Sequence, residues 1–177
     1  VEAVRGGLAA TRRLLHGSGA PHRRQSATPF DPAFLNLAGG IAPGRLAEAL
    51  QRNGHGRLCF YGPPGTGKTE FAQAVAHAAG LGTYRVKTAD DDGDGLSRKG
   101  RLGAYQLLQR LLRGRSDCLV IFDEVEDAFG NGGQDVLRAL FGGRPASSHG
   151  EKGWMNRVLE ENPVPAVWIT NDADSMD

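Results

Sequence analysis

The chain has 177 residues, enough for one domain with its own hydrophobic core. Apolar residues make up 40% and charged residues 23%, and the net charge of +1 argues against general affinity for nucleic acid or anionic membranes. No apolar run approaches the roughly 20 residues of a membrane span, and no secretory signal is visible, so we expect a cytoplasmic protein without membrane contact. The chain starts with Val1 and stops at Asp177 without a terminal signal, and we expect it to be part of a longer protein.

The N-terminal segment, residues 1–29, differs in composition from the rest. It carries five arginines against one acid, and apolar residues recur at helical spacing over 2–15. Residues 16–32 are rich in Gly, Pro, Ser and His, which is typical of a linker. We therefore predict a basic helix and linker over 1–29, followed by a second domain over 30–177. The basic arm lacks interleaved aromatic residues that would stack on bases, so we interpret it as solvated surface.

From residue 43 onward, helical and strand patterns alternate along the chain. Apolar spacing and composition predict helices at 43–52, 68–79, 100–113, 134–141 and 152–161. Short apolar or alternating runs predict strands at 57–61, 83–87, 118–122 and 166–170. Most of these strands are apolar throughout, which is typical of a parallel sheet buried on both faces. We therefore predict a three-layer α/β fold, with helices on both faces of a parallel sheet.

The loop between the first of these strands and its helix carries the strongest motif. Residues 62–69 read GPPGTGKT and match the phosphate-loop pattern GxxxxGK[ST] without a mismatch, between a strand and a helix as the pattern requires. Glycines let the main chain fold so tightly that successive N–H groups converge on phosphate, and the helix start adds partial positive charge. The pattern predicts that ATP is held by Gly62, Pro63, Pro64, Gly65, Thr66, Gly67, Lys68, Thr69 and Glu70. Within this loop, the Lys68 ammonium serves the outer phosphates and the Thr69 hydroxyl ligates Mg²⁺.

Two carboxylates follow the strand at 118–122, at the strand end where ligands bind in open parallel sheets. We predict that Asp123 holds Mg²⁺ with Thr69, directly or through water, and that Glu124 orients and deprotonates the attacking water. The alternative is that the pair caps the next helix. Asp127 is a possible further ligand, which we interpret instead as a surface residue.

Asn171 follows the strand at 166–170 in the same way. Its amide has donors and an acceptor, so it can hydrogen-bond both a γ-phosphate and the attacking water. The alternative is a loop residue that starts a turn with Asp172.

Two further patterns do not predict metal sites. Asp90, Asp92 and Asp94 fit the first half of a calcium-binding loop, but Arg101 stands where a bidentate glutamate is required, so we interpret the loop as solvated. Cys59 and Cys118 lie in apolar runs far apart, and we interpret them as reduced core residues.

Three segments in this order and spacing resemble the Walker A, Walker B and sensor-1 segments of AAA+ ATPases: residues 62–69, 119–124 and 166–171. The resemblance implies a P-loop NTPase core with a five-stranded parallel sheet, then a helical lid beyond this chain. It also implies a homo-oligomeric ring or partial ring with ATP at subunit boundaries, and an adenine pocket near Gly39, Gly40 and Ile41. Residues 123–129 and 152–172 more narrowly resemble a group of bacterial AAA-family ATPases, and 17 arginines against 4 lysines agree with a GC-rich bacterial genome.

The chain departs from the family in two respects. It stops before the positions of an arginine finger and a second sensor arginine, so we expect the fragment alone to hydrolyse ATP poorly. The loop at 88–100 lacks the aromatic–hydrophobic–Gly motif of polypeptide-threading members, which argues against an unfoldase.

The resemblance implies Mg²⁺-dependent ATP hydrolysis, with Lys68, Glu124 and Asn171 as catalytic residues. It also implies that hydrolysis drives the remodelling of a macromolecular partner, which we expect to be a protein. The alternative is a nucleotide-dependent switch or assembly scaffold that binds ATP with little hydrolysis. A small-molecule P-loop kinase fits less well, because the polar tip at Asn171 after a separate strand is not a feature of those enzymes.

Overall fold

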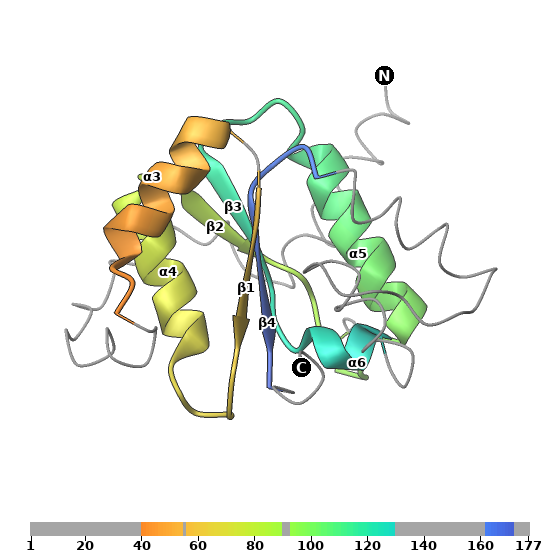
Figure 1. The fold of residues 1–177 in the computed structure, drawn as a ribbon. Helices are drawn as coiled ribbons and strands as arrows, with labels where there is room; N and C mark the ends of the chain where they lie inside the picture. Colours follow the sequence, from red (N-terminus) through yellow and green to blue (C-terminus); the bar gives the residue numbers. More distant parts are fainter. Residues whose placement is uncertain (1–39, 55, 90–92, 130–161, 172–177) are drawn as a thin grey trace, which may run out of the picture.

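A computed structural model describes residues 40–54, 56–89, 93–129 and 162–171 (Figure 1). The elements in chain order are α3 (Pro43–Asn53), β1 (Arg57–Tyr61), α4 (Lys68–Ala78), β2 (Gly82–Arg85), α5 (Arg98–Leu111), β3 (Cys118–Phe122), α6 (Val125–Phe129) and β4 (Ala166–Thr170). The predicted helices at 2–15, 134–141 and 152–161 lie outside the described residues, as does the linker. The domain boundary at 29/30 therefore stays a prediction.

The strands form a parallel sheet in the order β1-β4-β3-β2. The last strand in sequence, β4, thus lies between β1 and β3, with Tyr61 opposite Thr170 and Phe122 opposite Trp168. Because the strands run in the same direction, the segments that follow β1, β3 and β4 leave the sheet at one edge. The family resemblance implies five strands, and the described part of the chain contains these four.

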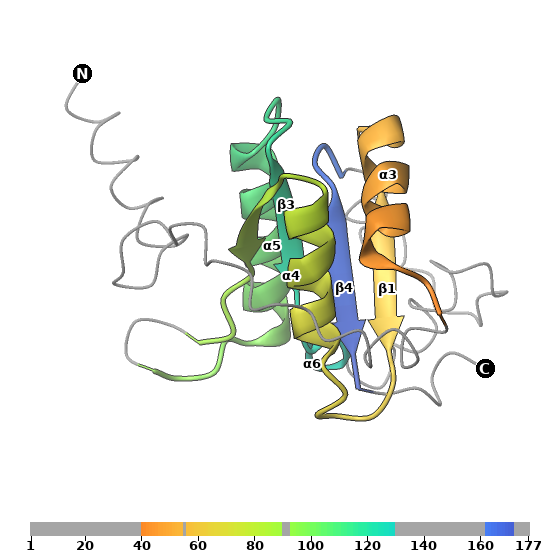
Figure 2. The ribbon, with the colours of Figure 1, turned by 90° about the vertical axis from the view of Figure 1, so that its left-hand side faces the viewer.

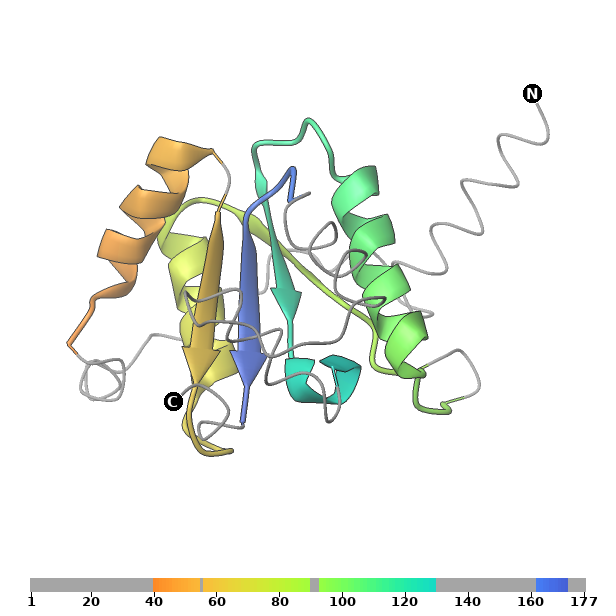
Figure 3. The same cartoon turned by 45° about the vertical axis from the view of Figure 1, so that its right-hand side comes forward.

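Helices cover both faces of the sheet, as predicted. Figures 2 and 3 show α3 and α4 on one face, and α5 on the other. Strands β3 and β4 are buried along their whole length, and their side chains alternate between two cores. On the α3/α4 side the strand residues are Leu119, Ile121, Val167 and Ile169. On the α5/α6 side they are Cys118, Val120, Phe122, Ala166 and Trp168. The three-layer α/β fold is therefore confirmed.

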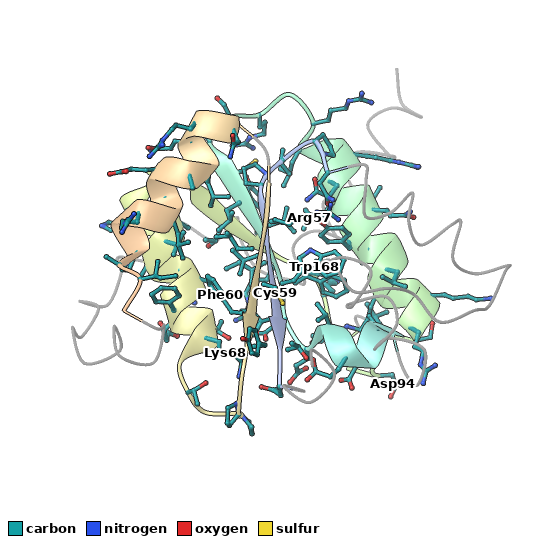
Figure 4. The ribbon with its side chains drawn as sticks, viewed as in Figure 1. Arg57, Cys59, Phe60, Lys68, Asp94 and Trp168 are labelled. Atoms are coloured by element: carbon teal, nitrogen blue, oxygen red, sulfur yellow. The ribbon has the colours of Figure 1, made fainter. Side chains whose placement is uncertain are left out.

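The edge strand β1 shows the same alternation. Figure 4 shows Phe60 on the α4 side of the sheet, whereas Arg57 and Trp168 lie on the α5 side. Phe60 meets Phe71 of α4 edge-to-face, with ring centroids 5.1 Å apart. Such aromatic contacts fix the position of α4 on the sheet beyond what simple apolar burial does.

Several predicted element boundaries differ from the observed ones by one or two residues, and one short helix was not predicted. Strand β2 covers 82–85 instead of 83–87, although the N–H of Val86 still donates to the carbonyl of Ile121 at 3.0 Å. Helix α5 starts at Arg98 instead of residue 100, because the Ser97 side chain caps it by accepting a hydrogen bond from the Gly100 N–H at 3.2 Å. The short helix α6 was not predicted, because five residues are too few to show a periodic pattern.

A buried polar network ties α5 to the segment before β4. The Gln109 side chain donates to the Val164 carbonyl at 3.2 Å and accepts from the Val164 N–H at 3.1 Å. It also donates to the Tyr105 hydroxyl, which accepts from the Trp168 indole N–H at 3.3 Å. Gln109 and Val164 are almost fully buried, so these polar groups depend on one another.

We predict that Gln109→Met lowers the free energy of unfolding by about 2–4 kcal/mol, because it leaves the buried N–H and carbonyl of Val164 without this partner. Urea unfolding compares it with the wild type. Gln106→Met is the matched control, since Gln106 lies on the same helix and is partly exposed. A loss below about 1 kcal/mol, or an equal loss in the control, would contradict the prediction.

Both cysteines are free thiols inside strands, and Cys118 is buried whereas Cys59 is half-buried. Burial raises the pKa of the Cys59 thiol to about 12 and also raises the pKa of Cys118. The interpretation of Cys118 as a core residue is confirmed. No helix among the described residues is long and apolar enough to cross a membrane.

The raised thiol pKa values predict slow alkylation of the folded protein. At pH 8, Cys59 should react with iodoacetamide at least about 100-fold more slowly than exposed thiols of pKa about 8.5, and Cys118 should also react more slowly than they do. Above about pH 8.5 the unfolded chain loses thiol protons that the folded protein keeps, so stability should fall as pH rises toward 12. Mass spectrometry of labelled peptides, with and without urea, measures the rates. Equal rates in both conditions would refute the prediction.

Candidate nucleotide site

The phosphate loop joins β1 to α4 and depends on glycine for its shape. Gly62, Gly65 and Gly67 have φ of 141°, 76° and 79°, a region that residues with a side chain rarely adopt. Gly67 is the N-cap of α4, and no side chain caps that helix end. The first N–H groups of an 11-residue helix therefore point out of its N-terminus beside the loop, which is an arrangement suited to bind phosphate.

Lys68 lies over this loop, near the end of β1 (Figure 4). Its ammonium donates to the carbonyls of Gly62 and Pro63, both at 2.7 Å. The Thr66 hydroxyl donates to the same Pro63 carbonyl at 2.9 Å. Charge-assisted hydrogen bonds to phosphate are stronger than those to neutral carbonyls, so an arriving phosphate can take over the ammonium. The loop is thus held in shape by the cation that is predicted to bind the ligand.

The two predicted metal ligands lie in contact. The Thr69 hydroxyl donates to Oδ2 of Asp123 at 2.9 Å, although the residues are 54 positions apart. An octahedral Mg²⁺ with bonds of about 2.0–2.1 Å places adjacent ligand oxygens about 2.9 Å apart. A hydroxyl and a carboxylate are also the hard oxygen donors that Mg²⁺ prefers. The donor set therefore fits Mg²⁺, whether the ion binds these oxygens directly or through water.

Arg85, at the end of β2, also contacts this carboxylate. Its Nη2 donates to Oδ2 of Asp123 at 2.9 Å, and the two side chains are 56% and 20% exposed. Arg85 is not among the residues predicted from the sequence, because the predicted strand runs past it to residue 87. A guanidinium on a metal-binding carboxylate competes with the metal, because both cations are attracted to the same oxygen.

Glu124 follows Asp123 directly and is exposed. Among the described residues, Glu124 is the one non-glycine residue with a positive φ, which is 51°. Its N–H donates to Oδ1 of Asp123 at 3.1 Å, which ties the two acidic residues together. Residues with side chains larger than those of Asn and Asp are strained in the left-handed region. Such backbone strain is often found at functional sites.

Asn171 lies at the end of β4 and contacts α6. Its main-chain N–H and its Nδ2 donate to Oε1 of Glu126 at 3.2 Å and 3.1 Å. The second oxygen of Glu126, Oε2, is buried without a hydrogen-bond partner among the described residues. Glu126 fixes which way the Asn171 amide faces, and it is not among the residues predicted from the sequence. The sequence did contain a signal for Glu126, because residues 123–127 read DEVED. Glu126 follows Asp123 by about one helical turn.

The other candidates are placed as follows. Pro64 and Glu70 are exposed at the loop and the start of α4. Ile41 is 46% exposed and Gly40 is exposed, whereas Gly39 lies outside the described residues, so the adenine pocket stays a prediction. Asp127, interpreted as a surface residue, has a side chain that is 70% exposed and pairs with Arg101 at 3.6 Å.

The acidic loop is only partly described, since Asp90 and Asp92 lie outside the described residues. Arg101, at the position where a calcium-binding loop requires glutamate, is buried and turned toward the acidic pair. Across the described ranges, no group of three or more His, Cys, Asp or Glu residues is arranged to hold a metal ion.

Comparisons with known proteins point to one family. Residues 58–177 match the sequence profile of the ATPase family associated with various cellular activities (AAA). The ATPase family AAA domain-containing protein 3 of Caenorhabditis elegans is 34% identical over 121 residues, 65% of this chain and 20% of that protein. The human ATPase family AAA domain-containing protein 3A is 30% identical over 129 residues, 73% of this chain and 21% of that protein. The ATP-dependent zinc metalloprotease FtsH of Aster yellows witches'-broom phytoplasma is 34% identical over 108 residues, 59% and 14% of the two chains. The chain thus spans about a fifth or less of the length of these relatives.

We predict that Arg85→Ala tightens Mn²⁺ binding to the ATP-bound protein by about 3- to 10-fold, because it removes a positive charge that competes for Asp123. Electron paramagnetic resonance of Mn²⁺, which stands in for Mg²⁺, measures the affinity. Arg52→Ala is the control, since Arg52 is an exposed arginine that pairs with Glu48 on α3. Weaker binding in Arg85→Ala would mean that Arg85 orders Asp123 for the metal instead of competing with it.

Proposed function

The chain belongs to the ATPase family associated with various cellular activities, and from this premise we propose that the intact protein hydrolyses Mg²⁺-bound ATP to remodel a macromolecular partner. Membership implies a nucleotide-dependent activity. The proposal adds the roles of individual residues, the reaction and the class of partner.

The contact between Thr69 and Asp123 carries the proposal. It joins the phosphate loop to the acidic pair at 2.9 Å, so phosphate-binding and metal-binding groups meet at one point. When bound there, Mg²⁺ would neutralise phosphate charge and orient the phosphate chain. The loop from Gly62 to Glu70 holds the phosphates through its main-chain N–H groups, which Pro63 and Pro64 lack, and Lys68 supplies its positive charge to the outer phosphates.

Glu124 and Asn171 serve the attacking water in this proposal. Glu124 accepts a proton from the water, for which its exposed carboxylate, next to Asp123, is suited. Asn171 orients the water or the γ-phosphate with the amide hydrogen that Glu126 leaves unused. Phosphoryl transfer needs mainly positioning and charge stabilisation, so these few groups suffice at the site.

The partner class and the assembly rest on similarity alone. One similar protein is named an ATP-dependent zinc metalloprotease and others are named Lon protease, which supports ATP-driven work on a protein chain. A ring or partial ring of identical subunits would bring an arginine from a neighbour to the site. Together with the match to a family of ATPases, this favours a protein as the remodelled partner and a homo-oligomer as the active form.

A specific observation favours a second candidate, a switch or scaffold that binds ATP and turns it over slowly. Lys68 is held by two carbonyls and Asp123 by Arg85. Both groups must exchange partners before they can serve phosphate and metal. If that exchange of partners is coupled to a change of assembly, nucleotide binding alone, without hydrolysis, switches the protein between states.

We predict that Glu124→Gln in the intact protein lowers the kcat of ATP hydrolysis by about 10²–10⁴-fold, because the amide cannot accept the proton, while ATP affinity changes by less than about 3-fold. Steady-state phosphate release and nucleotide titration measure the two quantities. Glu48→Gln, on the exposed face of α3, is the control.

The outcomes separate the two candidates. Turnover in the wild type and in Glu48→Gln, together with stalling in Glu124→Gln, supports hydrolysis as the function. ATP binding without turnover in all three, at concentrations where the protein assembles, supports the switch. Unchanged turnover in Glu124→Gln would refute the role of Glu124.

A further inference from the structure

Arg101 is a buried arginine that the proposed chemistry does not use. It lies in the first turn of α5 and is 3% exposed. Its guanidinium packs against the core on the α5/α6 face of the sheet, at Phe122. A buried guanidinium must find hydrogen-bond acceptors or countercharge, since taking a cation out of water is costly. The partners that it finds are therefore informative about its role.

Its partners are main-chain groups of the acidic pair. Nη1 donates to the carbonyl of Glu124 at 2.9 Å, and Nη2 donates to the carbonyl of Asp123. The guanidinium also lies 5.4 Å from the centroid of the Phe122 ring, a favourable cation–π contact. One side chain thus holds three consecutive residues where the chain leaves β3.

Neutralisation of charge does not account for this arrangement. The carboxylate that pairs with Arg101, Asp127, is 3.6 Å away and its side chain is 70% exposed, where ion pairs contribute little. The Nε of Arg101 is buried without a partner among the described residues. The hydrogen bonds to the two carbonyls are therefore the main polar contacts of the buried guanidinium.

The carbonyls that Arg101 holds belong to the strained part of the turn. Glu124 has a φ of 51°, and its carbonyl also accepts from the Asp127 N–H at 3.2 Å. Rotation of Glu124 to the ordinary helical or extended regions would turn these carbonyls and redirect both carboxylates. Two hydrogen bonds from a rigid, planar guanidinium oppose that rotation.

We propose that Arg101 is a positioning residue that acts through the main chain of Asp123 and Glu124, and directs their carboxylates toward the phosphate loop. The inference rests on the proposed function of these two acids. It does not require Arg101 to touch nucleotide or metal. A lysine at this position keeps the charge but cannot bridge both carbonyls with a planar fork.

The test compares Arg101→Lys with Arg98→Lys in the intact protein, since Arg98 is exposed in the same turn of α5. For Arg101→Lys we expect kcat to fall at least about 30-fold, with the KM for ATP within about 3-fold of the wild type. The Mn²⁺ affinity of the ATP-bound protein should fall at least about 5-fold, while metal-free ATP binding stays unchanged. A residue that only packs α5 against the sheet would lower the Tm without this split.

Three results would overturn the proposal: an equal loss in Arg98→Lys, an unchanged Mn²⁺ affinity in Arg101→Lys, or a matching loss of metal-free ATP binding. If the wild type binds ATP without turnover, hydrolysis as the function fails, and the positioning role is judged on Mn²⁺ affinity alone.

A measurement on the wild type covers the case in which Arg101→Lys does not fold. Hydrogen–deuterium exchange of the Asp127 amide, which donates to the Glu124 carbonyl, should be as slow as that of amides in the core strands. A five-residue helix such as α6 would fray and exchange fast unless its first turn were held. Fast exchange at Asp127, like that of exposed loops, would refute a held turn.

Discussion

Parallel pairing of β4 between β1 and β3 is the constraint on which the site depends. It brings the residues after β1, after β3 and after β4 to one edge of the sheet, although they are far apart in sequence. The apolar strands β3 and β4 are buried on both faces, so their register with β1 is set by two cores at once. A shift of one residue would exchange the two faces of a strand, which makes the position of Asp123 and Asn171 as rigid as the core itself.

At that edge, charge is balanced internally. Lys68 is bound by the carbonyls of its own loop, and Arg85 is bound to Asp123. Neither cation is left without a partner, so binding of nucleotide and metal is an exchange of partners in a preformed site. The free energy of such an exchange is a difference between two sets of contacts. We therefore expect substitutions at Arg85 to alter metal affinity without any change at the phosphate loop itself.

The parts that sequence could predict are those with a local pattern. The fold class followed from apolar strands alternating with helices, and GPPGTGKT predicted the sharp turn that three glycines make through positive φ. The meeting of Thr69 with Asp123 followed from the rule that parallel strands present their ends together.

The contacts of Arg85, Arg101 and Glu126 could not be predicted, because each depends on packing between elements distant in sequence. A helical pattern indicated that position 101 is on α5, but an arginine there is expected to be exposed. The boundaries of β2 and α5 were wrong by two residues for a related reason. The main chain at those ends is decided by Ser97 and by pairing with Ile121, which the apolar pattern does not show.

Because Arg101 hydrogen-bonds to main-chain carbonyls, the contact has a consequence for sequence variation among related proteins. Every residue has a carbonyl group, so substitutions at 123 or 124 leave the acceptors of Arg101 in place. Position 101 would therefore show no covariation with the two positions that it holds, even if their geometry depends on it. Among relatives with this contact, its mark would be an invariant arginine without a covarying partner, which pairwise methods for finding contacts would pass over.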